Sequence, residues 1–156
     1  VRSVSTAAFG GARAAVKAAA KIMESRVSTN TGKASKADPH LQAAVAKAHA
    51  QILEMESTLR LTFDDLMAHA ERGEAIPMEK RSLYAYNSST VVRRLADLVD
   101  DMMQLLGGRA IYMTSEIIQP WLDINAGRAH VANDPSNRYA DVVGSMFGEA
   151  PTFTFQ

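Results

Sequence analysis

The longest regular pattern in the chain runs from residue 39 to residue 73. Apolar residues recur there at mostly three- and four-residue steps, which is the period of one face of an α-helix. Asp38 and Pro39 supply a capping side chain and a proline suited to the first helical position. A helix of about eight turns exceeds the usual globular length, so the pattern predicts a helical bundle. The residues predicted to face its core are Leu41, Val45, Ala48, Ile52, Met55, Leu59, Phe63, Leu66 and Ala70.

An earlier helix is predicted over residues 3–28, which are rich in alanine. Small residues along one of its faces allow a neighbouring backbone to come close. Asn30 and Gly32, within residues 28–33, are suited to ending it. The predicted face consists of Val4, Ala8, Gly11, Ala15, Ala18 and Ile22.

A third helix is predicted from after Pro77 to about Leu106. It carries two apolar stripes that together cover a wider arc than one neighbouring helix can bury. This surplus indicates a position between helices or at a subunit interface. One stripe is Tyr84, Val91, Leu95, Leu98, Met102 and Leu105, and the other is Val92, Ala96, Val99, Met103 and Leu106.

The pair Gly107-Gly108 breaks the helical pattern. A fourth helix is predicted from about Ser115 to Val131, and a short last helix over residues 136–147. Almost no segment alternates as a strand does. We therefore expect an all-α fold, an antiparallel four-helix bundle with a short C-terminal helix, forming one domain over residues 1–156.

Composition excludes several classes of partner. The 17 Lys and Arg residues balance the 17 Asp and Glu residues, so no basic surface suited to nucleic acid or an anionic membrane is expected. No apolar run approaches the roughly 18 residues of a membrane span. The absence of cysteine removes disulfides and thiolate chemistry and is compatible with the cytoplasm. The chain begins at Val1 without an initiator methionine or a signal pattern, which we interpret as the start of a fragment.

A metal centre is not expected. A di-iron site in a four-helix bundle needs two Glu-x-x-His pairs, and none of the four histidines has an acidic residue three positions before it. The acidic residues Asp97, Asp100 and Asp101 are interpreted as a solvated helix face. The histidines expected at the surface or its boundary are His40, His49 and His69.

His130 has unusual surroundings. Small residues flank it within the segment 121–135, which leaves room for a flat group to approach. Asp123, Gly127 and His130 are predicted to lie near one face of one helix. From the residues alone, His130 is either a satisfied interior histidine or a functional imidazole. The glycine pair that ends the third helix is likewise either a helix terminator or bare backbone that lets a ligand approach.

Three motifs occur together in the last third of the chain. They are Gln104-Leu-Leu-Gly-Gly-Arg-Ala-Ile-Tyr112, Ile118-Gln-Pro-Trp-Leu-Asp123 and Gly127-Arg-Ala-His-Val-Ala-Asn133. Together they resemble the C-terminal signature of two-component aromatic hydroxylases, a branch of the acyl-CoA dehydrogenase superfamily that includes hydroxyphenylacetate hydroxylases. The similarity is strongest over residues 100–150 and looser over the first three helices.

One motif separates branches of that superfamily. Acyl-CoA dehydrogenases carry a Tyr-Glu-Gly-Thr-like segment here, and many take their catalytic base from it. This chain has Gly127-Arg128-Ala129-His130, which contains no carboxylate, and the monooxygenases have a histidine at this place. Leu122 departs from the family, which usually has Arg beside Asp123. The resemblance therefore implies that a helix-pairing ion pair is lost or is supplied by Arg128.

The resemblance also implies a site and its chemistry. His130 is expected to be catalytic, and the flavin-binding residues are expected to be Gln104, Gly107, Gly108, Arg109 and Val131. The cofactor would be reduced FMN or FAD supplied by a separate flavin reductase, and a flavin C4a-hydroperoxide would hydroxylate a small aromatic, phenolic substrate. Contacts of this kind often cross a subunit boundary in the superfamily, so a homodimer or homotetramer is expected.

Two alternatives stay open at this point. One is an acyl-CoA dehydrogenase-like flavoenzyme domain, and the other is a helical oligomerisation module without catalysis. The superfamily also has an N-terminal helical domain and a middle β-domain, which supply much of the flavin and substrate pocket. We therefore expect that this chain alone neither binds flavin tightly nor turns over.

Overall fold

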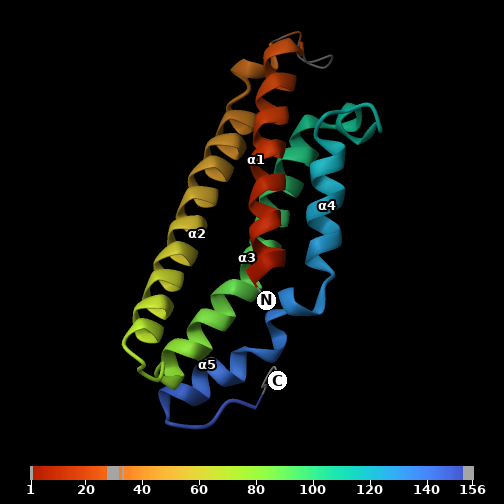
Figure 1. Cartoon of the computed structure of the whole chain (residues 1–156). Coiled ribbons are helices and arrows are strands. Elements are labelled where there is room, and N and C mark those ends of the chain that lie inside the picture. Colours follow the sequence, from red (N-terminus) through yellow and green to blue (C-terminus); the bar gives the residue numbers. More distant parts are fainter. Residues whose placement is uncertain (1, 28–31, 33, 153–156) are drawn as a thin grey trace.

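Helices make up most of the described chain, and each long helix runs antiparallel to the next long helix along the sequence (Figure 1). The structure is a computed structural model that describes residues 2–27, 32 and 34–152, apart from the side chains of residues 2–4 and 137. The bundle consists of α1 (Arg2–Ser25), α2 (Pro39–Glu71), α3 (Met78–Leu106) and α4 (Ile118–Arg128), and α5 (Tyr139–Met146) lies at the end where α2 turns into α3. The 3-10 helices that connect them within the described residues are η1 (Ser35–Ala37), η2 (Gly108–Ile111), η3 (Val131–Asn133) and η4 (Pro135–Asn137).

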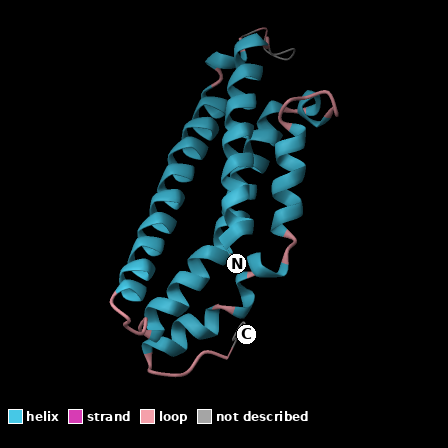
Figure 2. Cartoon of the chain, viewed as in Figure 1, coloured by secondary structure: helices cyan, strands magenta, loops and turns pink. Residues whose placement is uncertain are grey.

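Figure 2 shows helices and loops but no strand in the described part of the chain. The predicted all-α, four-helix architecture is confirmed. None of the described helices combines the length and the apolarity needed to cross a lipid bilayer.

The alanine-rich α1 packs against α2, α3 and α4. A Cβ added at Gly11 would lie 3.1 Å from Cγ1 of Ile124, so glycine at this position permits the close approach of α1 to α4. The helix ends at Ser25, three residues earlier than predicted. Residues 28–31 and 33 of the predicted terminator, and the side chain of Val4, lie outside the described residues.

The buried face of α2 repeats every seven residues and differs from the predicted face in its second half. Phe63 is 50% exposed and Ala70 is exposed, whereas Thr62 and His69 are buried. Strictly alternating steps of three and four residues would keep this register. The predicted face instead made two four-residue steps in succession, through Leu59 to Phe63. The prediction that His69 lies at the surface or its boundary is therefore wrong. The buried residues at seven-residue intervals are Leu41, Ala48, Met55, Thr62 and His69.

The helix α3 lies between its neighbours, as its apolar surplus predicted. It packs against α1, α2, α4 and α5, and both predicted stripes are buried apart from the half-buried Tyr84 and Leu105, which is 43% exposed. Its observed ends match the prediction. Gly107 adopts a φ of +70°, which side chains other than glycine rarely adopt, and so ends the helix.

The helix α4 is shorter than predicted. It covers Ile118–Arg128, and the chain then continues in the two short helices η3 and η4. His130 has an extended backbone with ψ of 133°, so it does not share a helix face with Asp123 and Gly127, and that prediction is wrong. The physical reason is that the Gly127 carbonyl accepts from the backbone of His130 and from the side chain of Asn133, which ends the helical hydrogen-bond pattern.

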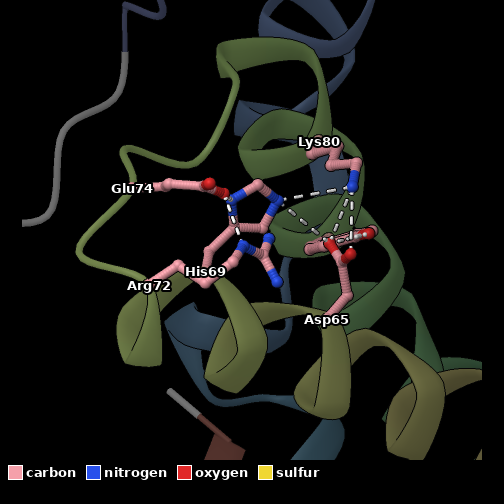
Figure 3. A network of polar contacts seen from close by, with 6 residues as sticks. Asp65, His69, Arg72, Glu74 and Lys80 are labelled. Carbon is pink, nitrogen blue, oxygen red and sulfur yellow. Dashed lines mark hydrogen bonds and ion pairs between the residues drawn. The ribbon is translucent and has the colours of Figure 1, made fainter.

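A polar cluster joins the end of α2 to the start of α3 (Figure 3). Lys80 Nζ donates to both carboxylate oxygens of Asp65 at 3.0 Å, and the Tyr84 hydroxyl donates to the same group at 2.8 Å. The hydrogen bonds from Lys80 and Tyr84 lower the pKa of Asp65 below its ordinary value of 3.8. The bond to Asp65 also raises the pKa of Lys80 and that of Tyr84.

His69, whose side chain is buried, completes this cluster (Figure 3). Its Nε2 atom is 3.5 Å from Lys80 Nζ and 3.8 Å from a carboxylate oxygen of Asp65. Its Nδ1 atom is 3.5 Å from Glu74 Oε2, which accepts from Arg72 Nε at 2.8 Å. The cluster therefore links α2, the turn that follows it and α3 by polar contacts.

Asp65→Asn should lower the melting temperature at neutral pH by a few degrees, because it removes the carboxylate that accepts from Lys80 and Tyr84. A carboxyl group whose folded pKa is lowered contributes stability above its ordinary value of 3.8 and loses it as the pH falls through the lowered pKa. The difference in melting temperature between the variant and the unaltered protein should therefore shrink below pH 3.8. Thermal unfolding followed by circular dichroism across that range measures it.

Asp64→Asn is the matched control, because Asp64 precedes Asp65 and is exposed. It should leave the melting temperature unchanged at each pH. A difference for Asp65→Asn that stayed constant down to about pH 2 would show that the carboxylate charge does not stabilise this turn.

Candidate functional site

A cavity of about 460 Å³ opens between the end of α3, η2 and α4. Its volume falls within the roughly 300–1,000 Å³ typical of small-molecule sites, and most of its surface is apolar. The residues that line it are Asp100, Met103, Gln104, Gly107, Gly108, Ile111, Trp121 and Arg128.

Asp100 is the polar centre of this cavity. Its Oδ1 atom accepts from Trp121 Nε1 at 2.6 Å, and its Oδ2 atom accepts from Arg128 Nη1 at 3.2 Å. Asn125 Nδ2 lies 3.5 Å from Asp100 Oδ1 and donates to the Trp121 carbonyl at 2.9 Å. The interpretation of Asp100 as part of a solvated face is therefore wrong, although Asp97 and Asp101 are exposed.

The α3–α4 ion pair settles the question raised by Leu122. Arg128 on α4 pairs with Asp100 at 3.2 Å and with Asp97 at 3.4 Å on α3. Asp123 instead accepts from Gln119 Nε2 at 2.7 Å, within its own helix. Of the two outcomes that the sequence left open, the supply of the ion pair by Arg128 is the one observed.

Asp100, Trp121 and Asn125 were not predicted as members of one site. The available signal was on α4, where Trp121, Asn125 and Arg128 follow the i, i+4, i+7 spacing of one helix face. All three are hydrogen-bond donors, so the face they form needs an acceptor on the helix opposite. Asp100 supplies it.

Three of the predicted flavin-binding residues come together at this cavity. Gln104, Gly107 and Gly108 line it. A Cβ added at Gly108 would meet no other atom within 4 Å, so packing within this chain does not require glycine there. Arg109 and Val131 are exposed and do not line the cavity.

His130 is exposed, which excludes the alternative of a satisfied interior histidine for this chain. Its Nδ1 atom accepts from the backbone N–H of Ala132 at 3.1 Å. It follows the C-terminal end of α4, whereas Gly107 and Gly108 lie near the N-terminal end of that helix (Figure 1). The 11 residues of α4 span about 16 Å, so the two predicted parts of the site are separated within one chain.

Other features of the described structure add no predicted site residue. A second cavity of about 510 Å³ lies between α1 and α2 and is almost wholly apolar, with Val16, Met23 and Val45 among its lining residues. Within residues 2–27, 32 and 34–152, no group of three or more histidine, aspartate or glutamate side chains is arranged to hold a metal ion.

Residues 3–135 match the family described as acyl-CoA dehydrogenase, C-terminal domain. Among curated proteins, the chain is 28% identical over 120 residues to the flavin-dependent monooxygenase, oxygenase subunit HsaA, of Mycobacterium tuberculosis. That alignment covers 77% of this chain and 30% of the relative, so the chain spans about 30% of the length of the protein it matches.

Solved structures agree with the fold. The crystal structure of the HsaA monooxygenase from M. tuberculosis superposes with a TM-score of 0.82 at 28% identity, covering 97% of this chain and 39% of that one. XiaF from Streptomyces sp., in complex with FADH2 and glycerol, superposes with a TM-score of 0.87 at 15% identity, covering 98% of this chain and 39% of that one. The second likeness is one of fold alone.

The resemblance drawn from the three motifs is thus confirmed at the level of the family. Because the family match takes in more than half of the residues, the chain belongs to the family of acyl-CoA dehydrogenase C-terminal domains.

Proposed function

We propose that this chain is the C-terminal helical domain of a longer, reduced-flavin-dependent monooxygenase that hydroxylates a small aromatic, phenolic substrate. The observation that carries the proposal is the 28% identity to the oxygenase subunit HsaA over 77% of the chain. The same alignment covers 30% of that subunit, which supports a role as one domain of a larger enzyme. A two-component system of this kind takes its reduced flavin from a separate reductase.

The residues at the α3–α4 cavity fit one part of a flavin. Gln104 offers an amide, Gly107 and Gly108 leave the backbone accessible, and the cavity walls are mostly apolar. Trp121 offers an aromatic ring whose N–H is already held by Asp100, so the ring is fixed in place. We infer that Gln104, Gly107 and Gly108 hold bound flavin, with Arg109 at the rim of the same turn. XiaF, whose likeness is one of fold alone, was solved in complex with FADH2, a reduced flavin.

The proposed role of His130 is to donate or accept one hydrogen bond at the reacting part of the flavin or the substrate. Reduced flavin, when bound, supplies the electrons that activate molecular oxygen for transfer to the aromatic ring. An exposed imidazole on a fixed turn can offer a hydrogen bond there, and Val131 beside it is 64% exposed and apolar. Together they would position polar atoms and exclude water.

The distance between the two parts of the site supports an oligomer. His130 and the Gly107-Gly108 turn lie at opposite ends of α4, so one flat ring does not reach both. We infer that each chain contacts two flavin molecules, one of them held mainly by a neighbouring subunit. Exposed apolar residues beside the cavity are available for such a contact. They are Ile111 at 63%, Tyr112 at 64% and Met113 at 74% exposure.

His130→Ala in the full-length enzyme should raise the fraction of reducing equivalents released as hydrogen peroxide by roughly fivefold, the effect of losing one hydrogen bond. Peroxide and hydroxylated product measured per reduced flavin consumed give that fraction. His40→Ala, an exposed histidine at the start of α2, is the control and should change nothing. Unchanged coupling in His130→Ala would count against the proposed role.

The chain alone should bind neither FMN nor FAD with sub-micromolar affinity, because residues from other domains and a neighbouring subunit complete the pocket. Fluorescence titration with each flavin, under reducing and oxidising conditions, measures this. Sub-micromolar binding to the isolated chain would contradict the division of the site that we propose.

At micromolar concentration the chain should form a homodimer or homotetramer in multi-angle light scattering. Met113→Glu should shift the mass toward the monomer, because it places a charge within the exposed apolar segment beside the cavity. Leu61→Glu, at an equally exposed leucine on α2, is the matched control and should keep the oligomer. A monomer for the unaltered chain would contradict self-association through this domain.

A further inference from the structure

One carbonyl group organises the segment that follows α4. Gly127 O accepts from the backbone N–H of His130 at 3.1 Å and from Asn133 Nδ2 at 2.7 Å. The backbone N–H of Asn133 in turn donates to the carbonyl of His130 at 2.9 Å. Both backbone polar groups of His130 are therefore engaged, one by Gly127 and one by Asn133.

The same turn holds the imidazole ring. The Nδ1 atom of His130 accepts from the backbone N–H of Ala132 at 3.1 Å. A neutral imidazole carries one proton, and a ring nitrogen that accepts a hydrogen bond does not hold it. The proton therefore lies on Nε2. Within the described part of the chain, Nε2 has no hydrogen-bond partner, and the side chain is exposed.

The buried side-chain amide of Asn133 has a specific hydrogen-bonding role in this turn. Its side chain is fully buried, and its Oδ1 atom has no hydrogen-bond partner in the described structure. A buried acceptor without a partner destabilises a fold, and an apolar side chain of similar size would avoid that cost. The amide is thus useful at this position for its Nδ2 donor, which reaches the Gly127 carbonyl.

We propose that Asn133 is a positioning residue, which fixes the turn after α4 so that His130 presents Nε2–H as a hydrogen-bond donor to an acceptor atom on a bound ligand. The consequence for catalysis rests on the proposed function, in which His130 contacts flavin or substrate. The arrangement makes His130 a donor in its neutral form. Protonation at Nδ1 would break the bond from Ala132 and release the ring from the turn.

Nitrogen NMR of the histidine rings tests the geometry without any turnover. The chain has four histidines, so 15N-histidine labelling gives few signals, and single His→Gln variants assign them. At about pH 8.5, where an ordinary imidazole is neutral, Nδ1 of His130 should have the shift of an unprotonated nitrogen and Nε2 that of a protonated one. A proton found on Nδ1 in the unaltered chain would overturn the proposal.

Hydrogen exchange tests the role of Asn133 in the same sample. The backbone N–H of Ala132 and the side-chain NH2 of Asn133 should be protected to a similar degree in the unaltered chain, because one opening of the turn exposes both. Independent exchange of the two groups would overturn the proposal even if no variant folded.

Asn133→Ala should reduce the protection of the Ala132 N–H by about tenfold and move both ring nitrogen shifts of His130 toward averaged values. Asp134→Ala is the matched control, because it removes the Asp134 cap on Ser136 N and leaves the Gly127 bond in place. Asp134→Ala should leave the nitrogen shifts of His130 unchanged, even if it lowers the melting temperature as much as Asn133→Ala does. Equal effects of the two variants on His130 would show a general loosening and overturn the proposal.

These experiments distinguish a failure of the proposed function from a failure of the positioning role of Asn133. If Asn133→Ala releases the ring but His130→Ala leaves peroxide release in the full-length enzyme unchanged, the proposed function fails and the positioning role stands. If His130→Ala raises peroxide release while Asn133→Ala leaves the ring shifts unchanged, the positioning role fails and the proposed function stands.

Discussion

The docking of α4 against α1 and α3 determines where the candidate site residues on and after α4 lie. Gly11 allows α1 to approach Ile124 so closely that an added Cβ would sit 3.1 Å from it, and Asp100 on α3 gathers the polar face of α4. One contact is apolar and one is charged, and both act on the same short helix. Close packing leaves α4 little freedom to slide. Its two ends, beside the Gly107-Gly108 turn and at His130, are therefore fixed relative to the bundle.

Helix ends were predictable from sequence where the signal is local. Pro77 and Gly107 act through their own backbone conformations, and α3 begins and ends where they indicate. The end of α4 depends instead on Asn133, whose side chain reaches back six residues to the Gly127 carbonyl. The periodicity of residues 115–131 gives no sign of this side-chain hydrogen bond, so the predicted helix extended three residues too far.

The same difference between local signals and contacts distant in sequence decided which site residues were predictable. The motif residues Gln104, Gly107 and Gly108 were predictable as a group because they are neighbours in the chain, and they do line one cavity. The role of Asp100 was not predictable, because an aspartate among other acidic residues is normally solvated. The donors to Asp100, on Trp121 and Arg128, lie 21–28 residues further along the chain. Exposure likewise depends on register. In α2 a one-residue drift was enough to exchange the buried Thr62 for the exposed Phe63.

The separation of the two parts of the site has a consequence for how an enzyme built on this domain would work. Residues at the cavity can hold a cofactor without touching the atoms that react, whereas an imidazole beyond the far end of α4 can act only on a group that arrives from outside the chain. Binding and chemistry would then depend on different neighbours of the same helix. The domain would serve as a rigid spacer between them. The Asp100–Arg128 pair and the Asn133–Gly127 bond, both at the C-terminal end of α4, would fix the end that carries His130.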